Sequence, residues 1–141
     1  FSNRLGDFAT GIYGSAEQVE RYKAGFRKSL DGAPMLLPTR HNALRSRIDR
    51  WLESEGVRPR VIAEFEDSAL LNTFGREGLG LFPAPLALSE QIGTQLNAQV
   101  LGAMNGVSEQ IFAISNERRI RHPAIEVLCS ASPQAEVLSG V

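Results

Sequence analysis

The chain has 141 residues, of which 43% are hydrophobic and 22% charged, and this balance fits one domain with a core of its own. The formal net charge of -1 excludes a global positive field that would draw the chain to nucleic acid or to an acidic membrane. No apolar run reaches the ~20 residues of a membrane helix. The single cysteine excludes an intrachain disulfide and favours a reducing compartment.

The first predicted elements are a strand and a capped helix. Residues 8–13, FATGIY, are typical of a short strand. Ser15 and Gln18 have the spacing of a capping box, so a helix is expected to begin there. After a loop, residues 35–37 predict a brief buried strand that Pro38 stops.

An amphipathic helix is expected next. Asn42 suits its N-cap, and Gly56 suits the left-handed residue that ends it. Residues 60–65, RVIAEF, then predict a strand, and Asp67 or Ser68 can cap the helix that follows. The apolar stripe of the helix between Asn42 and Gly56 is Leu44, Ile48, Trp51 and Leu52.

The second half of the chain predicts shorter elements. Gly78 is expected to end the helix, and LGLF at 79–82 lacks polar alternation, as a strand covered on both faces does. Pro83 and Pro85 are expected to end this strand. The pattern continues with a short helix over 86–92, strands at 99–104 and 110–115, and a last helix from Pro123.

Strands that alternate with helices in this way predict βαβ units around a parallel sheet, so the expected fold class is α/β. Ligands of such sheets bind beyond the carboxyl ends of the strands. Three segments qualify by position: PTRHN at 38–42, EDS at 66–68 and PAP at 83–85.

Nucleotide binding and catalysis are not expected. The run GREGLG, residues 75–80, reverses the glycine order of the dinucleotide fingerprint and lies at a helix end, whereas phosphate needs a helix N-terminus. Cys129 lies among apolar residues and is expected to be a buried thiol without a base such as His41 or His122. These side chains are too few for a zinc site, so no catalytic residue, metal or cofactor is predicted.

The segment PTRHN favours an anion or a carbonyl as its ligand. Thr39 offers a hydroxyl, Arg40 a guanidinium, His41 an imidazole, and the helix start near Asn42 offers free backbone N–H groups. The alternative is a capped helix with a solvated Arg40. The other arginines of this region are interpreted as a solvated helix face and not as a DNA-binding stripe: Arg45, Arg47, Arg50, Arg58 and Arg60.

The second polar segment contains carboxylates at a strand-to-helix turn. Glu64 and Glu66 alternate on the strand, and Asp67 follows at the turn. Nothing in the sequence separates their environments as acid–base catalysis requires. Capping by Asp67 is the simplest interpretation, and ligand contact by Glu66 or Ser68 is compatible with it.

The order of these pieces resembles the effector-binding domain of LysR-type transcriptional regulators. The resemblance covers about residues 7–128, and its most specific part runs from EFEDSALL to GLGLFPAP, with ISNERRIRHPAI in support. Within the family it is closest to the NhaR group, activators of sodium/proton antiporter genes.

The resemblance implies a fold similar to type II periplasmic binding proteins, in which the effector binds between two α/β lobes joined by crossover strands. It implies a lobe with a parallel-dominated sheet plus part of the other lobe. The implied divisions are 1–14 for the first crossover strand, 15–105 for the complete second lobe, 106–130 for the return strand and helix of the first lobe, and 131–141 for a flexible tail. A winged helix-turn-helix is not recognised among these pieces, so promoter DNA is an expected partner only through a segment outside this chain.

By position, the family's effector contacts in the second lobe fall on the same two segments. They are Pro38, Thr39, Arg40, His41, Asn42, Glu66, Asp67 and Ser68. The NhaR likeness implies a response to sodium, whereas Arg40 with Thr39 favours a small organic anion. The effector stays open between these two.

The expected function is therefore a cytoplasmic, non-catalytic, effector-sensing part of a transcriptional activator. Its expected partners are a small molecule or an ion, promoter DNA, and further copies of itself in a dimer or tetramer, and no membrane. A solute-binding receptor of the same fold is the alternative.

Overall fold

A computed structural model describes residues 2–114 of the chain as strands that alternate with helices. None of the described helices is long and apolar enough to cross a membrane. The predicted helix from Pro123 and the thiol of Cys129 lie outside the described residues. In chain order the elements are β1 (Ser2–Gly14), α1 (Ala16–Tyr22), the 3₁₀ helix η1 (Lys28–Leu30), β2 (Pro34–Pro38), α2 (Ala43–Glu55), β3 (Arg60–Phe65), α3 (Ser68–Arg76), β4 (Phe82–Pro85), the 3₁₀ helix η2 (Leu86–Leu88), α4 (Ser89–Leu96) and β5 (Gln99–Ile114).

Three helices begin at predicted caps, and α2 ends at its predicted glycine, whereas the helix expected over 86–92 is the 3₁₀ turn η2 followed by α4 over Ser89–Leu96. Ser15 and Gln18 form both hydrogen bonds of the capping box at the start of α1. Asn42 caps α2, and Gly56 ends it with a left-handed φ of 69°. Asp67 caps α3. These boundaries are local in origin, because a side-chain oxygen satisfies a backbone N–H that the first helical turn leaves without a partner.

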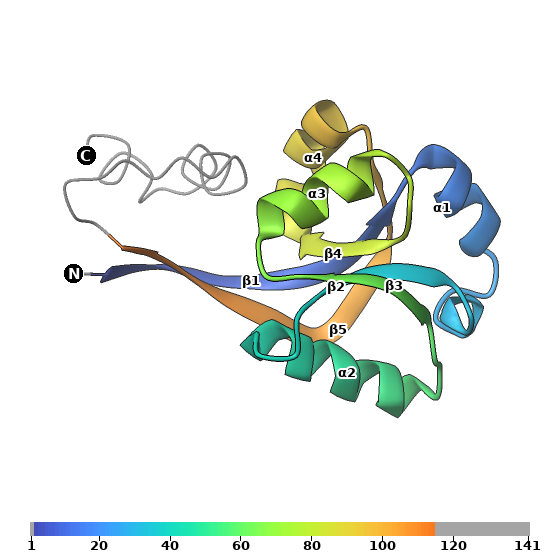
Figure 1. Cartoon of the computed structure of the whole chain (residues 1–141), viewed down its shortest axis with the longest axis horizontal. Helices are drawn as coiled ribbons and strands as arrows, with labels where there is room; N and C mark the ends of the chain where they lie inside the picture. The colour runs from blue at the N-terminus through green and yellow to red at the C-terminus, as the bar shows by residue number, and fades with distance from the viewer. Residues whose placement is uncertain (1, 115–141) are drawn as a thin grey trace.

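The strands pair in a mixed pattern (Figure 1). β2 and β3 form a parallel ladder in which Pro38 is opposite Phe65. β1 lies between β4 and β5 and pairs antiparallel with both. A parallel bridge between Met35 and Leu81 connects the two sheets. The α/β class is confirmed, and the antiparallel ladders of β1 make the pairing mixed where a parallel-dominated sheet was expected.

The strand predicted at 79–82 is shifted along the chain. The prolines expected to end it lie inside β4, where Pro83 is opposite Ile12 and Pro85 is opposite Thr10 of β1. Within the described residues β4 forms a full ladder with β1 alone. Proline is tolerated at such a position because the N–H that it lacks is not needed by a second ladder.

The two strands predicted at 99–104 and 110–115 are one continuous strand, β5, which follows β1 along its length. The ladder shifts register where Ala9 pairs with Ser108 and Gly11 pairs with Ala103, so β5 carries extra residues there. Gly106, with a φ of 84°, supplies a left-handed residue in this bulge. The bulge interrupts the alternating pattern in the sequence without ending the strand.

Apolar layers cover both faces of the sheet. Tyr13 and Leu36 pack in the cluster that includes residues of α3 and α4, whereas their neighbours Ile12 and Leu37 pack in the cluster that includes residues of α2. Adjacent strand residues point to opposite faces, so β1 and β2 each supply both clusters. Figure 1 shows α3 and α4 on one side of the strands and α2 on the other. Trp51 of α2 is 6% exposed, which confirms the predicted helix stripe.

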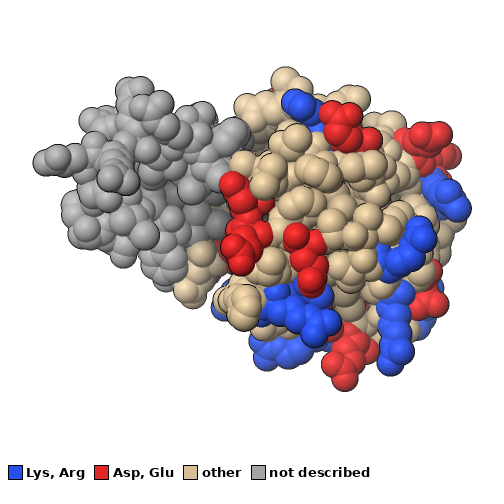
Figure 2. All heavy atoms as spheres, viewed as in Figure 1, with Lys and Arg blue, Asp and Glu red and all other residues tan. Residues whose placement is uncertain are grey.

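β3 forms an outer edge of the described sheet and exposes apolar side chains. Val61 and Ile62 are 41% and 45% exposed, and Leu70 and Phe74 of the neighbouring α3 are 52% and 40% exposed. Figure 2 shows an uncharged area on this face with acidic and basic side chains around it. Exposed apolar groups beside an edge strand are typical of a surface that pairs with another segment.

Candidate functional site

The loop after β2 is a tight turn with exposed polar side chains. Pro38 is buried at the end of β2, Thr39 is half-buried, and Arg40, His41 and Asn42 are exposed. The N–H of Asn42 donates to the carbonyl of Thr39 at 3.0 Å. The Oδ1 of Asn42 accepts a backbone N–H from the first turn of α2 at 2.8 Å. The expected cap is confirmed, and the turn presents Arg40 and His41 at the surface.

The loop after β3 leads directly into α3. Glu66, Asp67 and Ser68 are all exposed. The Oδ1 of Asp67 accepts the N–H of Ala69 at 2.7 Å, so the capping role predicted for Asp67 is confirmed. Ser68 is the first residue of α3 and does not act as its N-cap.

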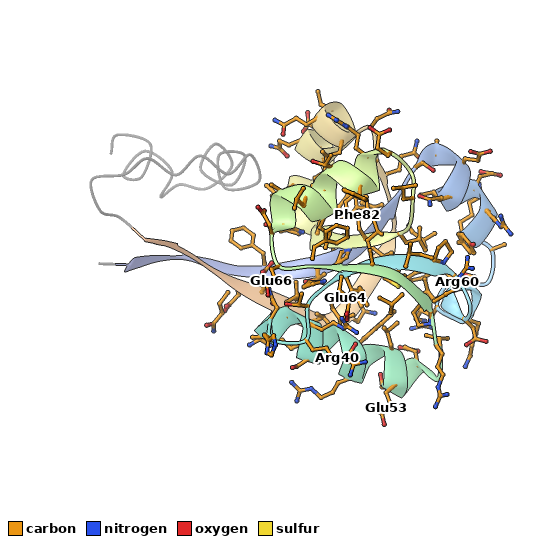
Figure 3. All side chains as sticks on the ribbon, in the orientation of Figure 1. Arg40, Glu53, Arg60, Glu64, Glu66 and Phe82 are labelled. Atoms are coloured by element: carbon orange, nitrogen blue, oxygen red, sulfur yellow. The ribbon has the colours of Figure 1, made fainter. Side chains whose placement is uncertain are left out.

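The two loops lie side by side because β2 and β3 are parallel. The N–H of Thr39 donates to the carbonyl of Phe65 at 3.1 Å and joins the first loop to the end of β3. Figure 3 shows Glu64 and Glu66 near the end of β3, with Arg40 near the start of α2. The third candidate segment, 83–85, is part of β4 and is not a loop.

Beneath this surface lies a buried arginine that joins three elements. Only 5% of the side chain of Arg45 in α2 is exposed. Its Nη1 donates to the carbonyl of Pro38 at 2.8 Å and to a carboxylate oxygen of Glu64. Its Nε donates to Asp49 one turn along α2 at 2.9 Å. The guanidinium therefore connects the end of β2, the end of β3 and α2.

These contacts shift the pKa values of the pair. Burial of Arg45 by itself would lower its pKa, but its hydrogen bonds to Glu64 and Asp49 outweigh burial and raise the pKa. The hydrogen bond from Arg45 lowers the pKa of Glu64, with a further charge effect from Arg40. Glu64 is therefore held as a carboxylate by Arg45, and Arg40 acts on it only through its charge.

The surface above this pair has the chemistry of a binding site for a small charged group. Arg40 offers donors to an anion, and Glu66 offers oxygens to a cation. Among the described residues, no three His, Cys, Asp or Glu side chains gather as a group able to hold a metal ion.

Sequence reasoning missed Arg45, which the prediction placed on a solvated face. The interpretation is wrong for this residue, and Arg47 is also half-buried, with its Nη1 donating to the carbonyl of Ser108 at 3.0 Å. Arg45 lies three and seven residues before Ile48 and Leu52, which belong to the buried stripe of α2. Helical periodicity therefore carried the signal of its burial.

Comparison with known proteins identifies the family of this fold. Residues 20–134 match the family described as the LysR substrate binding domain. The chain belongs to that family. Its match extends beyond the described residues and includes both loops of the candidate site.

Relatives of known name are transcriptional regulators. The chain is 27% identical over 135 residues to the transcriptional activator protein NhaR of Escherichia coli, covering 96% of this chain and 44% of NhaR. NhaR of Shigella flexneri matches to the same extent. The chain therefore spans less than half the length of these curated relatives.

Solved regulatory domains of other proteins share the fold. The reduced regulatory domain of OxyR2 from Vibrio vulnificus has a TM-score of 0.55 at 17% identity, covering 99% of this chain and 64% of that one. The CcmR regulatory domain of Synechocystis PCC6803, solved in complex with 2-PG, has a TM-score of 0.59 at 11% identity, covering 100% of this chain and 68% of that one. At these identities the likeness concerns the fold alone.

Proposed function

We propose that the chain is the effector-sensing part of a NhaR-like transcriptional activator and that it has no catalytic role. The observation that carries this proposal is the pair of loops at the carboxyl ends of β2 and β3, joined by the hydrogen bond between Thr39 and Phe65. The family and the 27% identity to NhaR support it. We propose that the effector contacts lie on Pro38, Thr39, Arg40, His41, Asn42, Glu66, Asp67 and Ser68.

Two effector classes fit these loops, and we propose sodium as the first to test. Sodium prefers carboxylate, carbonyl and water oxygens, which Glu66 and the neighbouring turn supply. Glu64 is bonded to Arg45, so Glu66 is the more accessible carboxylate for an ion. The likeness to NhaR supports sodium, through the antiporter genes that its group activates.

The second candidate effector is a small organic anion. Exposed Arg40 beside the start of α2 favours it, because a guanidinium and the N-terminal end of a helix both attract negative charge. CcmR, whose regulatory domain has the same fold, was solved in complex with 2-PG. Substitution Arg40→Gln should weaken binding of such an anion and leave a response to sodium in place.

The deciding experiment measures promoter activation by the full-length regulator with added sodium chloride, and with potassium chloride at equal ionic strength. Glu66→Gln should blunt the sodium response, because it removes the charge and keeps the size of the side chain. Glu77→Gln, at an exposed carboxylate beyond the other end of α3, is the matched control and should respond as the unmodified protein does.

Two results would contradict the sodium proposal. Equal activation by both salts would reduce the effect to ionic screening, which does not distinguish the two cations. A full sodium response in Glu66→Gln would show that the sodium site lies elsewhere than at this turn. Promoter binding itself is proposed to require a segment of the longer protein outside this chain.

A further inference from the structure

Arg45 is a buried cation at the base of the candidate site that does not reach its surface. Its side chain is 5% exposed, whereas Arg40 on the loop above is exposed. Burying a charge is costly unless hydrogen bonds and opposite charges compensate. Three acceptors around Arg45 provide that compensation: the carbonyl of Pro38 and the carboxylates of Glu64 and Asp49.

The partners of Arg45 come from both sides of the site. Pro38, whose carbonyl accepts from Nη1 at 2.8 Å, is the residue from which the first loop begins. Glu64, which accepts from the same Nη1, is two residues before Glu66 of the second loop. One guanidinium nitrogen of Arg45 therefore contacts the ends of both strands from which the two loops begin.

The remaining partner holds the guanidinium to its own helix. Asp49 accepts from Nε at 2.9 Å with half of its own side chain exposed. The planar fork of arginine allows Nε and Nη1 to bond to different acceptors at the same time. Lysine, with a compact charge at one atom, cannot reproduce this arrangement.

We propose that Arg45 is a positioning residue that sets the Pro38–Asn42 loop against the end of β3, with Glu64 as its anchor rather than as an effector contact. Through this link it sets the spacing between Arg40 and Glu66, the charged groups that the loops present. The proposal rests on the proposed function of the same two loops, and it assigns to Glu64 a role that the sequence alone did not indicate.

The first test follows the loop without any effector. Amide hydrogen exchange of the 141-residue chain, resolved by NMR, reports the N–H of Thr39, which bonds to Phe65, and that of Asn42, which closes the turn. In Arg45→Lys and in Glu64→Ala both amides should exchange about ten- to a hundred-fold faster, as expected when a charged hydrogen bond is lost. Amides of the β1–β5 ladder should keep their rates.

Asp49→Ala is the matched control because it removes a partner of Arg45 that belongs to neither loop. Its loop amides should stay within about threefold of the unmodified rates, since the hydrogen bonds from Arg45 to Pro38 and Glu64 both remain. Glu64→Gln, which keeps an oxygen acceptor, should restore most of the protection lost in Glu64→Ala. Unchanged protection at Thr39 and Asn42 in both Arg45→Lys and Glu64→Ala would overturn the proposal.

The second test uses the full-length regulator and sodium chloride as the probe. Glu64→Ala should raise the sodium chloride concentration that gives half-maximal activation by about fivefold or more, with the thermal midpoint of unfolding close to that of Asp49→Ala. A role in stability alone would lower the thermal midpoint without moving the half-maximal concentration, and that result would overturn the positioning role.

The two tests separate this proposal from the proposed function. If the unmodified regulator does not distinguish sodium from potassium, the effector assignment fails, while faster loop exchange in Glu64→Ala still supports positioning by Arg45. If the regulator responds to sodium but the loops keep their protection in the variants, positioning fails and the effector assignment stands.

Discussion

Gly75 of α3 lies directly against the ring of Phe82 at the start of β4. A Cβ atom at Gly75 would stand 2.5 Å from Cδ1 of that ring, which is closer than non-bonded carbon atoms approach one another. Phe82 is fully buried and stacks with Tyr13 at a centroid distance of 5.8 Å, so moving the ring would disturb this contact in the core. The absence of a side chain at residue 75 is what lets α3 pack on β4.

We predict that Gly75→Ala lowers the free energy of unfolding by about 1–3 kcal/mol, because it overpacks this contact. The matched control is Gly93→Ala in α4, where the nearest atom to a Cβ is the carbonyl oxygen of Ala98 at an ordinary 3.6 Å. That substitution should stabilise by about 0.5–1 kcal/mol, since alanine has the better helix propensity. Urea denaturation of both variants checks the difference in sign, and a stabilised Gly75→Ala would show that α3 is placed wrongly.

Leu52 tests the packing of α2 on the other face of the sheet. It is 6% exposed and belongs to the cluster that contains Ile48 and Met35. Leu52→Ala should lower the free energy of unfolding by about 2–5 kcal/mol, because it leaves a cavity in a close-packed layer. Leu70→Ala, at a helical leucine that is 52% exposed, should change it by about 0.5 kcal/mol or less. Equal denaturation midpoints for the two variants would contradict the assignment of the buried face.

Glu109 on β5 gives a prediction on pH dependence. Burial raises the pKa of this carboxyl group, and the positive charge of Arg47 only partly opposes the shift. A raised native pKa means that the carboxyl favours folding while it is protonated and that this contribution is lost as the pH rises through the native value. Above the ordinary carboxyl pKa, Glu109 therefore costs stability.

We predict that Glu109→Gln raises the thermal midpoint of unfolding at neutral pH, since the amide carries no charge to bury. The advantage should shrink as the pH falls below the ordinary carboxyl pKa of 4.5, where glutamate itself is protonated. Thermal scans at a series of pH values measure the difference. A variant that is less stable than the unmodified chain at neutral pH would show that Glu109 is held as a favourable ion pair instead.

The exposed edge of β3 gives a prediction on assembly. Ile62, which is 45% exposed, lies on β3 at an edge of the described sheet, next to the exposed apolar residues of α3. The chain is expected to self-associate, and Ile62→Lys should make it more monomeric in light scattering, because a charge on an edge strand opposes strand-to-strand contact. A stable monomer of the unmodified chain would contradict the prediction.

The sequence by itself determined the local features of this protein. The caps at Ser15, Asn42 and Asp67 and the left-handed end at Gly56 followed from residue types, because each involves atoms only a few residues apart. The apolar stripe of α2 followed from helical periodicity. The two loops at the carboxyl ends of β2 and β3 followed as well, since parallel strands place those ends at one edge.

Only the tertiary structure decided how distant segments combine. The prolines of β4 lie within a strand because β1 supplies the ladder on one side, and β5 is continuous because β1 supports it through the bulge at Gly106. Arg45 was misjudged for the same reason. Its acceptors on Pro38 and Glu64 are seven and nineteen residues away in the chain, and a buried charge is stable only where folding brings such partners to it.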